Sequence, residues 1–416
     1  MATPTAIEKR NLAAEIENAF QSRGLDGSPV NRKFLDAFLV QGFPGGKTEE
    51  YKFTPITRVL EKSFPSALPL PTTTSAAVRL IPELKCNLIV FINGVYSDEH
   101  STVIDKDVIV KKTTATDADD TDRFSLLNGA FAKEEIEISV GPGKMVSNPI
   151  AIVYHFDSAE FTFANPRWRV MTGDSSQVSV VEYTSAMQAG PYFNNKHSFI
   201  SVGRNAGVEY VNIQREPGDI LVNNCTVQLA ASSRAGCYTF TFDGQLVRNN
   251  LTLSIDGQGV DAHLYGLYLL SKNTIADNHT VVDHRKPNSS SNELYKGVME
   301  GSSKGIFNGK IYVRPDAQKT NAFQSNRNLL LSEGATVNTK PQLEIWADDV
   351  KCSHGCTTGQ LDEEALFYLR SRGIPKDLAK GMMLSAFATE TLSSMKQPVV
   401  QNFVSEIIAG KLQHGS

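Results

Sequence analysis

Long apolar runs are missing from this sequence of 416 residues. No stretch of about 18 apolar residues occurs, and charged residues interrupt positions 1–20. We therefore expect neither a membrane span nor a secretory leader. An excess of one charge is also missing, because 41 basic residues stand against 45 acidic ones. Such a balance provides no electrostatic footprint for nucleic acid or for an anionic membrane, and we expect neither as a partner.

Cysteine is scarce, and its spacing excludes a disulfide framework. The chain has five cysteines, an odd number, spread widely along the sequence. Small secreted proteins instead show an even set at regular spacings. A reducing compartment fits this pattern, so we expect a cytoplasmic protein. The five residues are Cys86, Cys225, Cys237, Cys352 and Cys356.

The N-terminal part has the spacing of helices. Apolar residues recur near helical spacing over residues 6–20 and again over residues 34–39, and Gly42 is expected to end the second helix. Residues 63–74 combine three prolines with small polar residues, which is typical of a linker. We predict an N-terminal helical domain with its linker over residues 1–75.

The central part has the texture of strands. From about residue 84 to 350, short runs rich in Val, Ile, Tyr, Phe and Thr follow one another, and no convincing helix interrupts them for long. Residues 205–213 and 234–242 echo one another, with Ala-Gly pairs 29 positions apart, and residues 259–265 form a weaker third copy. This loose repeat indicates a β-helix or another β-solenoid, although a β-sandwich also fits. We predict a mainly β core over residues 76–358.

Helical spacing returns at the C-terminal end, over residues 359–416. Residues 362–372 have acids in the first turn and basic residues in the last, and Gly373 follows as a stop. After Pro398, two apolar rows form a broad stripe that either packs on a local core or faces a partner. The rows are Val399, Phe403, Ile407 and Val400, Val404, Ile408.

Cys352, His354 and Cys356 place three soft metal-ligand candidates at alternate positions. In an extended strand these side chains point to the same face, and thiolate and imidazole suit zinc, copper(I) and iron–sulfur clusters. A structural zinc site needs four ligands, and no second pair is close in the sequence. The triplet therefore supplies at most half a site, which a second subunit would complete. A buried free cysteine also often acts as a small hydrophobe.

A second group of polar residues superficially resembles a metal site. It contains His279 and His284 together with Asp277 and Asp283. A spacing of five residues places the two histidines on neither one helix face nor one strand face. We expect structural hydrogen bonds from these side chains.

A carbohydrate-active enzyme is the alternative function that the β texture leaves open. A β-helix lyase or hydrolase needs carboxylates that converge on one face. The sequence shows no such clustering, and a solvated face is the default expectation. The carboxylates in question are Glu182, Glu209, Asp219, Asp243, Asp256 and Asp261.

Residues 348–355 and 359–374 strongly resemble the SufD branch of the SufB/SufD family, whose members are subunits of the SufBCD iron–sulfur cluster assembly scaffold. Ser353 to Gly355, and the absence of the additional N-terminal cysteines typical of SufB, favour the SufD branch. Further matches keep the family's order at residues 295–297, 305–311, 317–320, 329–332 and 340–344, and weaker ones lie at 47–54 and 91–94.

The resemblance implies a right-handed parallel β-helix flanked by N-terminal and C-terminal helical domains. It also implies a non-catalytic scaffold that pairs with SufB through terminal β-helix strands and binds the SufC ATPase through its C-terminal helices. A nascent iron–sulfur cluster or iron would be shared transiently with SufB, and reduced flavin is implied for the complex. An exposed terminal edge would also allow the isolated chain to pair with itself as a homodimer.

The same resemblance assigns roles to particular residues. His354 is the expected ligand for iron or the cluster, opposite a SufB cysteine, and Cys352 supports it. Cys356 departs from the family's pattern, which has alanine there, so it is either a third ligand or a packed replacement. Residues expected to bind a partner on the C-terminal helices are Leu366, Phe367, Leu369, Phe403 and Ile407.

Overall fold

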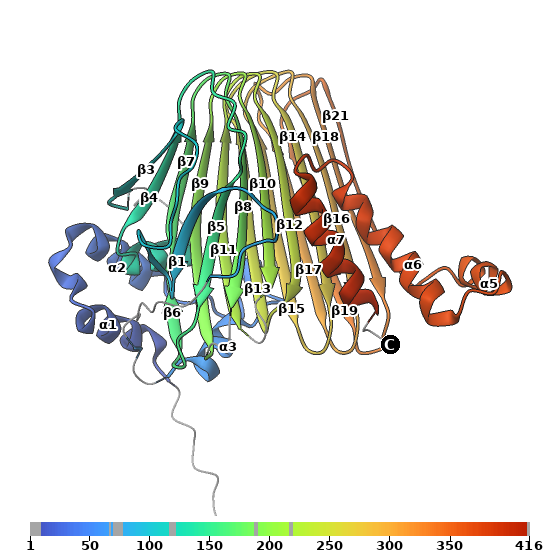
Figure 1. The fold of residues 1–416 in the computed structure, drawn as a ribbon, viewed down its shortest axis with the longest axis horizontal. Coiled ribbons are helices and arrows are strands. Elements are labelled where there is room, and N and C mark those ends of the chain that lie inside the picture. Colours follow the sequence, from blue (N-terminus) through green and yellow to red (C-terminus); the bar gives the residue numbers. More distant parts are fainter. Residues whose placement is uncertain are drawn as a thin grey trace, which may run out of the picture.

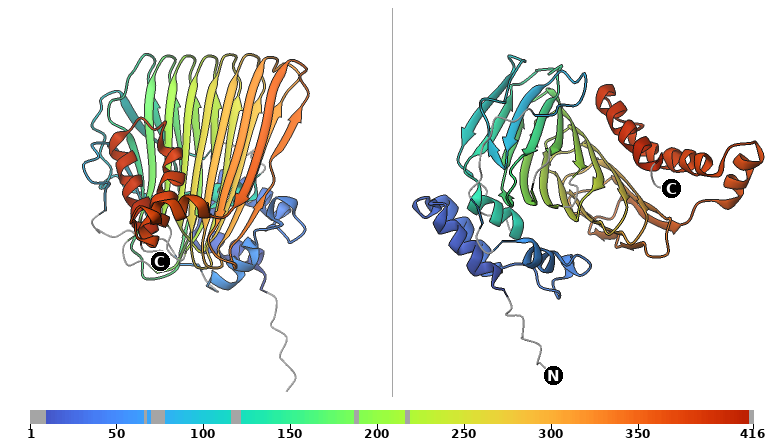
Figure 2. Two further views of the ribbon diagram at one scale, coloured as in Figure 1. Left: turned by 90° about the vertical axis from the view of Figure 1, so that its right-hand side faces the viewer. Right: turned by 60° about the horizontal axis from the view of Figure 1, so that its bottom comes forward.

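The computed structural model describes residues 10–65, 68–69, 78–115, 122–186, 190–215 and 219–413. Two long, mainly parallel sheets face one another and form a β-solenoid of about seven turns (Figure 1). Helices lie at both ends of the chain and cover opposite sides of this body (Figure 2). The predicted fold class, a mainly β solenoid flanked by N-terminal and C-terminal helices, is confirmed.

Each coil of the solenoid contributes one strand to each sheet, and we call the sheets A and B. Sheet A contains β1 (Asn87–Ile92), β2 (Val95–Tyr96), β5 (Ile150–Phe156), β8 (Gln177–Ala186), β10 (Gly207–Arg215), β12 (Arg234–Asp243), β14 (Asp261–Leu270), β16 (Ser290–Met299), β18 (Thr320–Leu330) and β21 (Val350–Gly359). Sheet B contains β3 (Val108–Thr113), β4 (Glu135–Val140), β6 (Thr162–Ala164), β7 (Arg167–Thr172), β9 (Tyr192–Val202), β11 (Ile220–Leu229), β13 (Leu246–Ile255), β15 (Ile275–His284), β17 (Lys304–Val313), β19 (Thr336–Thr339) and β20 (Gln342–Ile345).

The predicted echo corresponds to neighbouring strands of sheet A. Strands β10, β12 and β14 pair in parallel, in that order. The pairing joins Gly207 to Arg234 and Arg234 to Asp261, an offset of 27 positions rather than the 29 between the Ala-Gly pairs. A shift by two residues keeps every side chain on the same face of its strand. The repeat therefore identified the strands that pair and the faces of their side chains. Its offset differs from the observed register by two residues.

A recurrent left-handed residue turns the chain into each sheet A strand from β8 to β18. Each has a positive φ, and its N–H donates to a carbonyl of the next coil, as Asn205 N does to Ala231 O at 2.9 Å. These turns stack the coils at one corner, where polar residues or glycine tolerate the conformation. The corner residues are Ser175, Asn205, Ser232, Gly259, Asn288 and Lys319.

The core lies between the two sheets and mixes apolar and polar side chains. Ile152, Trp168 and Phe307 belong to its apolar part. Lys196 donates to Glu182 inside it, and the Tyr210 hydroxyl donates to the same carboxylate at 2.6 Å. Buried charges persist in such an interior because they are paired and hydrogen-bonded.

The N-terminal helices pack on the outer face of sheet B. They are α1 (Leu12–Ser22), α2 (Pro29–Gln41) and α3 (Ile56–Ser63), with short 3₁₀ turns at Leu25–Gly27 and Glu49–Tyr51. Gly42 ends α2 with φ of 61°, as predicted. The predicted linker at 63–74 lies mostly outside the described residues, and the domain boundaries at 75 and 358 stay a prediction.

One helix within the strand region was not predicted. Helix α4 (Arg123–Phe131) begins at Asp122, whose carboxylate accepts the N–H groups of Phe124 and Ser125. Every residue from Phe124 to Phe131 is buried, including the polar Ser125 and Asn128, so the helix has no solvent-facing polar side. Such a segment lacks the amphipathic period that sequence patterns detect.

The C-terminal helices begin after β21 and fold back over the outer face of sheet A. They are α5 (Glu363–Ser371), α6 (Lys376–Thr389) and α7 (Pro398–Gln413), with a 3₁₀ turn at Glu390–Leu392. Asp362 caps the N-terminus of α5. Gly373, which has a φ of 86°, follows the C-terminus of this helix as the stop that the sequence indicated. Helix α5 lies at the far tip, away from the strands (Figure 1). Within the described residues, no helix is long and apolar enough to cross a membrane.

Candidate functional site

Cys352, His354 and Cys356 lie on β21, the last strand of sheet A. The parallel register places them beside Ala322, Gln324 and Asn326 of β18. These three β18 residues are buried and point into the solenoid. The triplet therefore shares one face, as its spacing indicated, and that face continues the interior of the solenoid.

The triplet lies at the open end of the solenoid, which we define as the face formed by β19, β20 and β21. Cys352 is half-buried against the core, and burial raises the pKa of its thiol. His354 and Cys356 are exposed. The Cys356 Sγ lies 2.9 Å from the Thr339 Oγ1 of β19, so this side chain reaches across to the opposite sheet. The side chains of His354 and Cys356 are thus accessible from outside the chain at this end.

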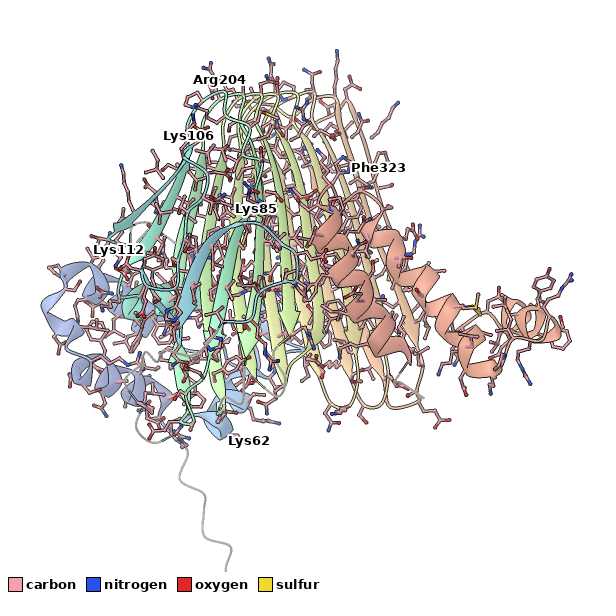
Figure 3. All side chains as sticks on the ribbon, in the orientation of Figure 1. Lys62, Lys85, Lys106, Lys112, Arg204 and Phe323 are labelled. Atoms are coloured by element: carbon pink, nitrogen blue, oxygen red, sulfur yellow. The ribbon has the colours of Figure 1, made fainter. Side chains whose placement is uncertain are left out.

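The edge of β21 is exposed along most of its length. In the part of the chain that the structure describes, β21 pairs with β18 and with no other strand on its outer side. Residues 353–359 are all exposed. Large apolar side chains are exposed on the elements next to β21: Phe323 on β18, Ile345 at the end of β20, and Trp346 directly after it (Phe323 is labelled in Figure 3). A long free edge with apolar neighbours is a surface that pairs with another chain.

The triplet does not form a complete metal site within one chain. Among the described residues, no three His, Cys, Asp or Glu side chains converge in a way that holds a metal ion. Soft ligands on a free edge fit half a site whose remaining ligands come from elsewhere.

Two buried polar residues lie behind the triplet, and the sequence pattern did not indicate them. Gln324 and Glu293 face inward on β18 and β16, next to one another, and both are almost fully buried. The Gln324 Nε2 donates to the Glu293 Oε2 at 2.8 Å. Burial raises the pKa of Glu293 to about 7, against hydrogen bonds from Thr280 and Gln324 that lower it. Only the strand register reveals that these residues follow His354 in one column.

The residues expected to bind a partner divide into two groups. Phe367 is 72% exposed on α5, where Leu369 is half-buried and Leu366 is buried. Phe403 and Ile407 on α7 are half-buried and line a cavity of about 930 Å³ between α7 and sheet A. Further large apolar side chains are exposed on α5 and α6: Tyr368, Leu378 and Met382.

The apolar stripe of α7 packs mainly on the solenoid. Val400, Val404 and Ile408 have no exposed surface and join the apolar cluster on the outer face of sheet A. The Glu209 Oε2 on that face accepts the Lys396 N–H at 2.7 Å, just before α7 begins. This row of the stripe therefore holds the helix in place.

The histidines and aspartates at positions 277–284 on β15 form hydrogen bonds and ion pairs within the chain, as expected. Arg248 Nη1 lies 2.5 Å from the Asp277 Oδ2, and the His279 Nε2 lies 3.1 Å from the Asp277 Oδ1. Burial lowers the pKa of His279. The His284 Nε2 lies 2.9 Å from the Ser291 Oγ.

His284 is expected to make stability depend on pH. Burial lowers its pKa to about 4, against about 6.5 in an unfolded chain. The unfolded state therefore binds the extra proton between these values, and the stability that is present above pH 6.5 falls as pH falls toward 4. We expect the free energy of unfolding, measured in urea, to fall between pH 7 and pH 5. The fall should be about 2 kcal/mol smaller in His284→Gln than in the native chain. Equal losses would contradict this assignment.

The carboxylates that a carbohydrate-active enzyme would need have structural partners instead. Glu182 pairs with Lys196, and Glu209 holds the chain before α7. The others accept hydrogen bonds from Tyr192 N to Asp219, Lys411 to Asp243, Arg285 to Asp256 and Ser290 to Asp261. This alternative gains no support from the geometry.

Comparisons with known proteins identify the family of this chain. The family model for the SUF system FeS cluster assembly SufBD core domain matches residues 154–387. The chain is 28% identical to the iron–sulfur cluster assembly protein SufD of Escherichia coli, over 98% of both chains. It is 29% identical to an iron–sulfur cluster assembly SufBD family protein of Synechocystis, over 97% of this chain and 96% of the relative.

A third relative extends the agreement to another group of bacteria. The iron–sulfur cluster assembly protein SufD of Bacillus subtilis is 27% identical, over 82% of this chain and 78% of its own. The family model covers more than half of the chain, including β21 and α5. The chain therefore belongs to the SufBD family of iron–sulfur cluster assembly proteins, and it is of the SufD type.

Proposed function

We propose that this chain is a non-catalytic scaffold subunit that pairs with SufB and binds the SufC ATPase, and that a nascent cluster is built where it meets SufB. The observation that carries the proposal is the position of His354, which stands on a free strand edge at the open end of a solenoid. The catalytic step, ATP hydrolysis, takes place on SufC. Reduced flavin is implied by the family resemblance alone, and we assign no residue of this chain to it.

Pairing with SufB is supported by the free edge of β21. Backbone groups along this strand have hydrogen-bonding capacity that a strand of another chain would satisfy. Exposed apolar area is added by Phe323 on the neighbouring strand β18 and by Ile345 and Trp346 at the end of β20. In the absence of SufB, the same edge provides a surface for pairing with a second copy.

Iron or cluster binding is supported by the chemistry of the triplet. His354 is exposed at the edge, and Cys352 lies two residues away on the same face. A neutral imidazole binds a cluster less tightly than a thiolate, which suits transient holding before transfer. Cys356 is exposed on this face as well, but its Sγ contacts the Thr339 hydroxyl, and we place His354 and Cys352 ahead of it as ligands.

Binding of SufC is supported by the exposed side of α5 and α6. Phe367, Tyr368, Leu378 and Met382 are 46–72% exposed there. Large apolar side chains that are exposed on neighbouring helices are typical of interaction surfaces. Leu369 borders this surface, and Leu366 packs behind it, whereas Phe403 and Ile407 face the cavity beside sheet A.

Reconstitution with SufB and SufC tests the proposal. His354→Ala should leave the complex assembled but lower its iron and cluster content at least about tenfold. Removing a residue that hydrogen-bonds a metal ligand lowers the metal affinity about 10- to 100-fold, and removing the ligand itself should lower it at least as much. His263→Ala is the matched control, because this partly exposed histidine lies on the outer face of sheet A beside Asp261. Iron uptake equal to that of the native complex would disprove the role of His354.

A further inference from the structure

His354, Gln324 and Glu293 form one column across the last three strands of sheet A. The register pairs His354 of β21 with Gln324 of β18, and Gln324 with Glu293 of β16. Gln324 is 3% exposed and Glu293 is 1% exposed. The exposed imidazole is therefore the outermost member of a polar column that continues into the core.

The amide of Gln324 has one satisfied end and one unsatisfied end. Its Nε2 donates to the Glu293 Oε2 at 2.8 Å. Its Oε1 is buried and has no hydrogen-bond partner among the described residues. A buried acceptor without a donor costs about 1–3 kcal/mol, so such an atom in a native chain calls for an explanation.

The chain makes room for this amide on the opposite sheet. Gly309 lies on β17 of sheet B, and a Cβ at that position would stand 2.0 Å from the Gln324 Nε2. Any larger residue at 309 would displace the side chain. Glu293 holds the nitrogen end of the amide and Gly309 leaves space for it, so the oxygen is the free end.

The other two members of the triplet have no comparable neighbour. Cys352 lies beside Ala322, which has no polar side-chain atom. Cys356 lies beside Asn326, whose Nδ2 donates to the Tyr268 hydroxyl and whose Oδ1 accepts from Asn328 at 2.7 Å. Of the three register neighbours, Gln324 alone retains an unused acceptor.

Among the described residues no hydrogen bond joins the side chains of His354 and Gln324. We propose that Gln324 is a positioning residue for His354: the exposed imidazole turns so that its N–H donates to the free amide oxygen, and Glu293 holds the amide in the orientation that presents this oxygen. The proposal rests on the proposed function, in which His354 binds iron. The hydrogen bond selects one tautomer and leaves the lone pair of the other ring nitrogen available for the metal. An acceptor that takes the N–H of a metal-binding histidine orients the ring and makes the other nitrogen a stronger ligand.

Histidine ring ¹⁵N signals of the full chain provide the test, at a pH of about 8.5 where histidines are ordinarily neutral. His354→Ala identifies the signals of His354. In the native chain they should correspond to a single tautomer. Gln324→Leu should move them toward the average of two tautomers, and Glu293→Gln should move them part of the way. Asn328→Leu removes a buried amide of the same strand that lies beside Thr358, and it should leave them unchanged.

Iron affinity of the reconstituted complex provides a second readout. Gln324→Leu should weaken it by about 10- to 100-fold, and Asn328→Leu should not. His354 signals identical to the native ones in both Gln324→Leu and Glu293→Gln would overturn the proposal. Glu293→Gln keeps the volume of the side chain but replaces one accepting oxygen by a donating NH₂ group, which weakens the hold on the Gln324 Nε2. It therefore decides the matter where Gln324→Leu does not fold. Native iron uptake by His354→Ala would instead refute the proposed function, whatever the signals show.

Discussion

Replacement of Arg248 by leucine is expected to lower the free energy of unfolding by about 3–5 kcal/mol, because it leaves the carboxylate of Asp277 buried without its cation. The side chain of Arg248 is 3% exposed and that of Asp277 is fully buried. Arg248 and His279 hold the pKa of Asp277 well below its usual range, although burial alone would raise it. The loss reflects the penalty of an unpaired buried charge.

Arg248 and Asp277 also connect residues 50–54 of the N-terminal part to sheet B. The Arg248 Nη1 donates to the Glu50 carbonyl at 2.8 Å, and its guanidinium lies 4.4 Å from the centre of the Tyr51 ring. The Thr54 hydroxyl donates to Asp277. Loss of Arg248 should therefore loosen the segment around residues 49–54 before the solenoid unfolds.

Urea unfolding and limited proteolysis measure this effect. Arg204→Leu is the matched control, since Arg204 pairs with Asp174 at an exposed turn and its side chain is 75% exposed (Figure 3). It should leave stability unchanged within error. Adding Asp277→Asn to Arg248→Leu should recover part of the loss, because the orphaned charge disappears. An unchanged urea midpoint for Arg248→Leu would show that the pair contributes little.

Replacement of Ile408 by alanine is expected to destabilise the C-terminal helices by about 2–5 kcal/mol. Ile408 has no exposed surface, and it joins Val400 and Val404 in the cluster between α7 and sheet A. Removing its side-chain carbons leaves a cavity that the stacked strands of the sheet cannot collapse to fill. Rigid surroundings make such a truncation costly.

Hydrogen exchange separates this effect from a global one. Amides of α6 and α7 should exchange faster in Ile408→Ala, while strands in the middle of the solenoid keep their native protection. Ile345→Ala makes the same chemical change at a residue that is 40% exposed and should have little effect. Native exchange rates in α7 would indicate that the polar contacts at Glu209 and Lys296 suffice to hold the helices.

Several predictions from local patterns agree with the structure because the responsible forces are local. Helix stops at Gly42 and Gly373 follow from the left-handed backbone that glycine adopts easily. The shared face of Cys352, His354 and Cys356 follows from the two-residue period of a strand. The strand texture and its loose repeat identified a solenoid, although a sandwich remained open until the pairing was known.

Features that depend on pairing between distant residues were not predictable in the same way. Helix α4 escaped detection because it is buried on all sides. The echo between residues 205–213 and 234–242 misplaced the register by two positions, since turn lengths between coils set the pairing. The column of Gln324 and Glu293 behind His354 depends on strands about thirty residues apart.

The sequence by itself determined the ligand types, their common strand face and the division into helices, strands and helices, because these depend on side-chain chemistry and short-range periodicity. Only the tertiary structure decided that the triplet continues the interior at an open end, that β21 has a free edge, and that a buried amide lies beside His354. The physical reason is that each coil is stabilised by the one beneath it. What lies next to a residue is therefore determined by the stacking of coils, which no single stretch of sequence contains.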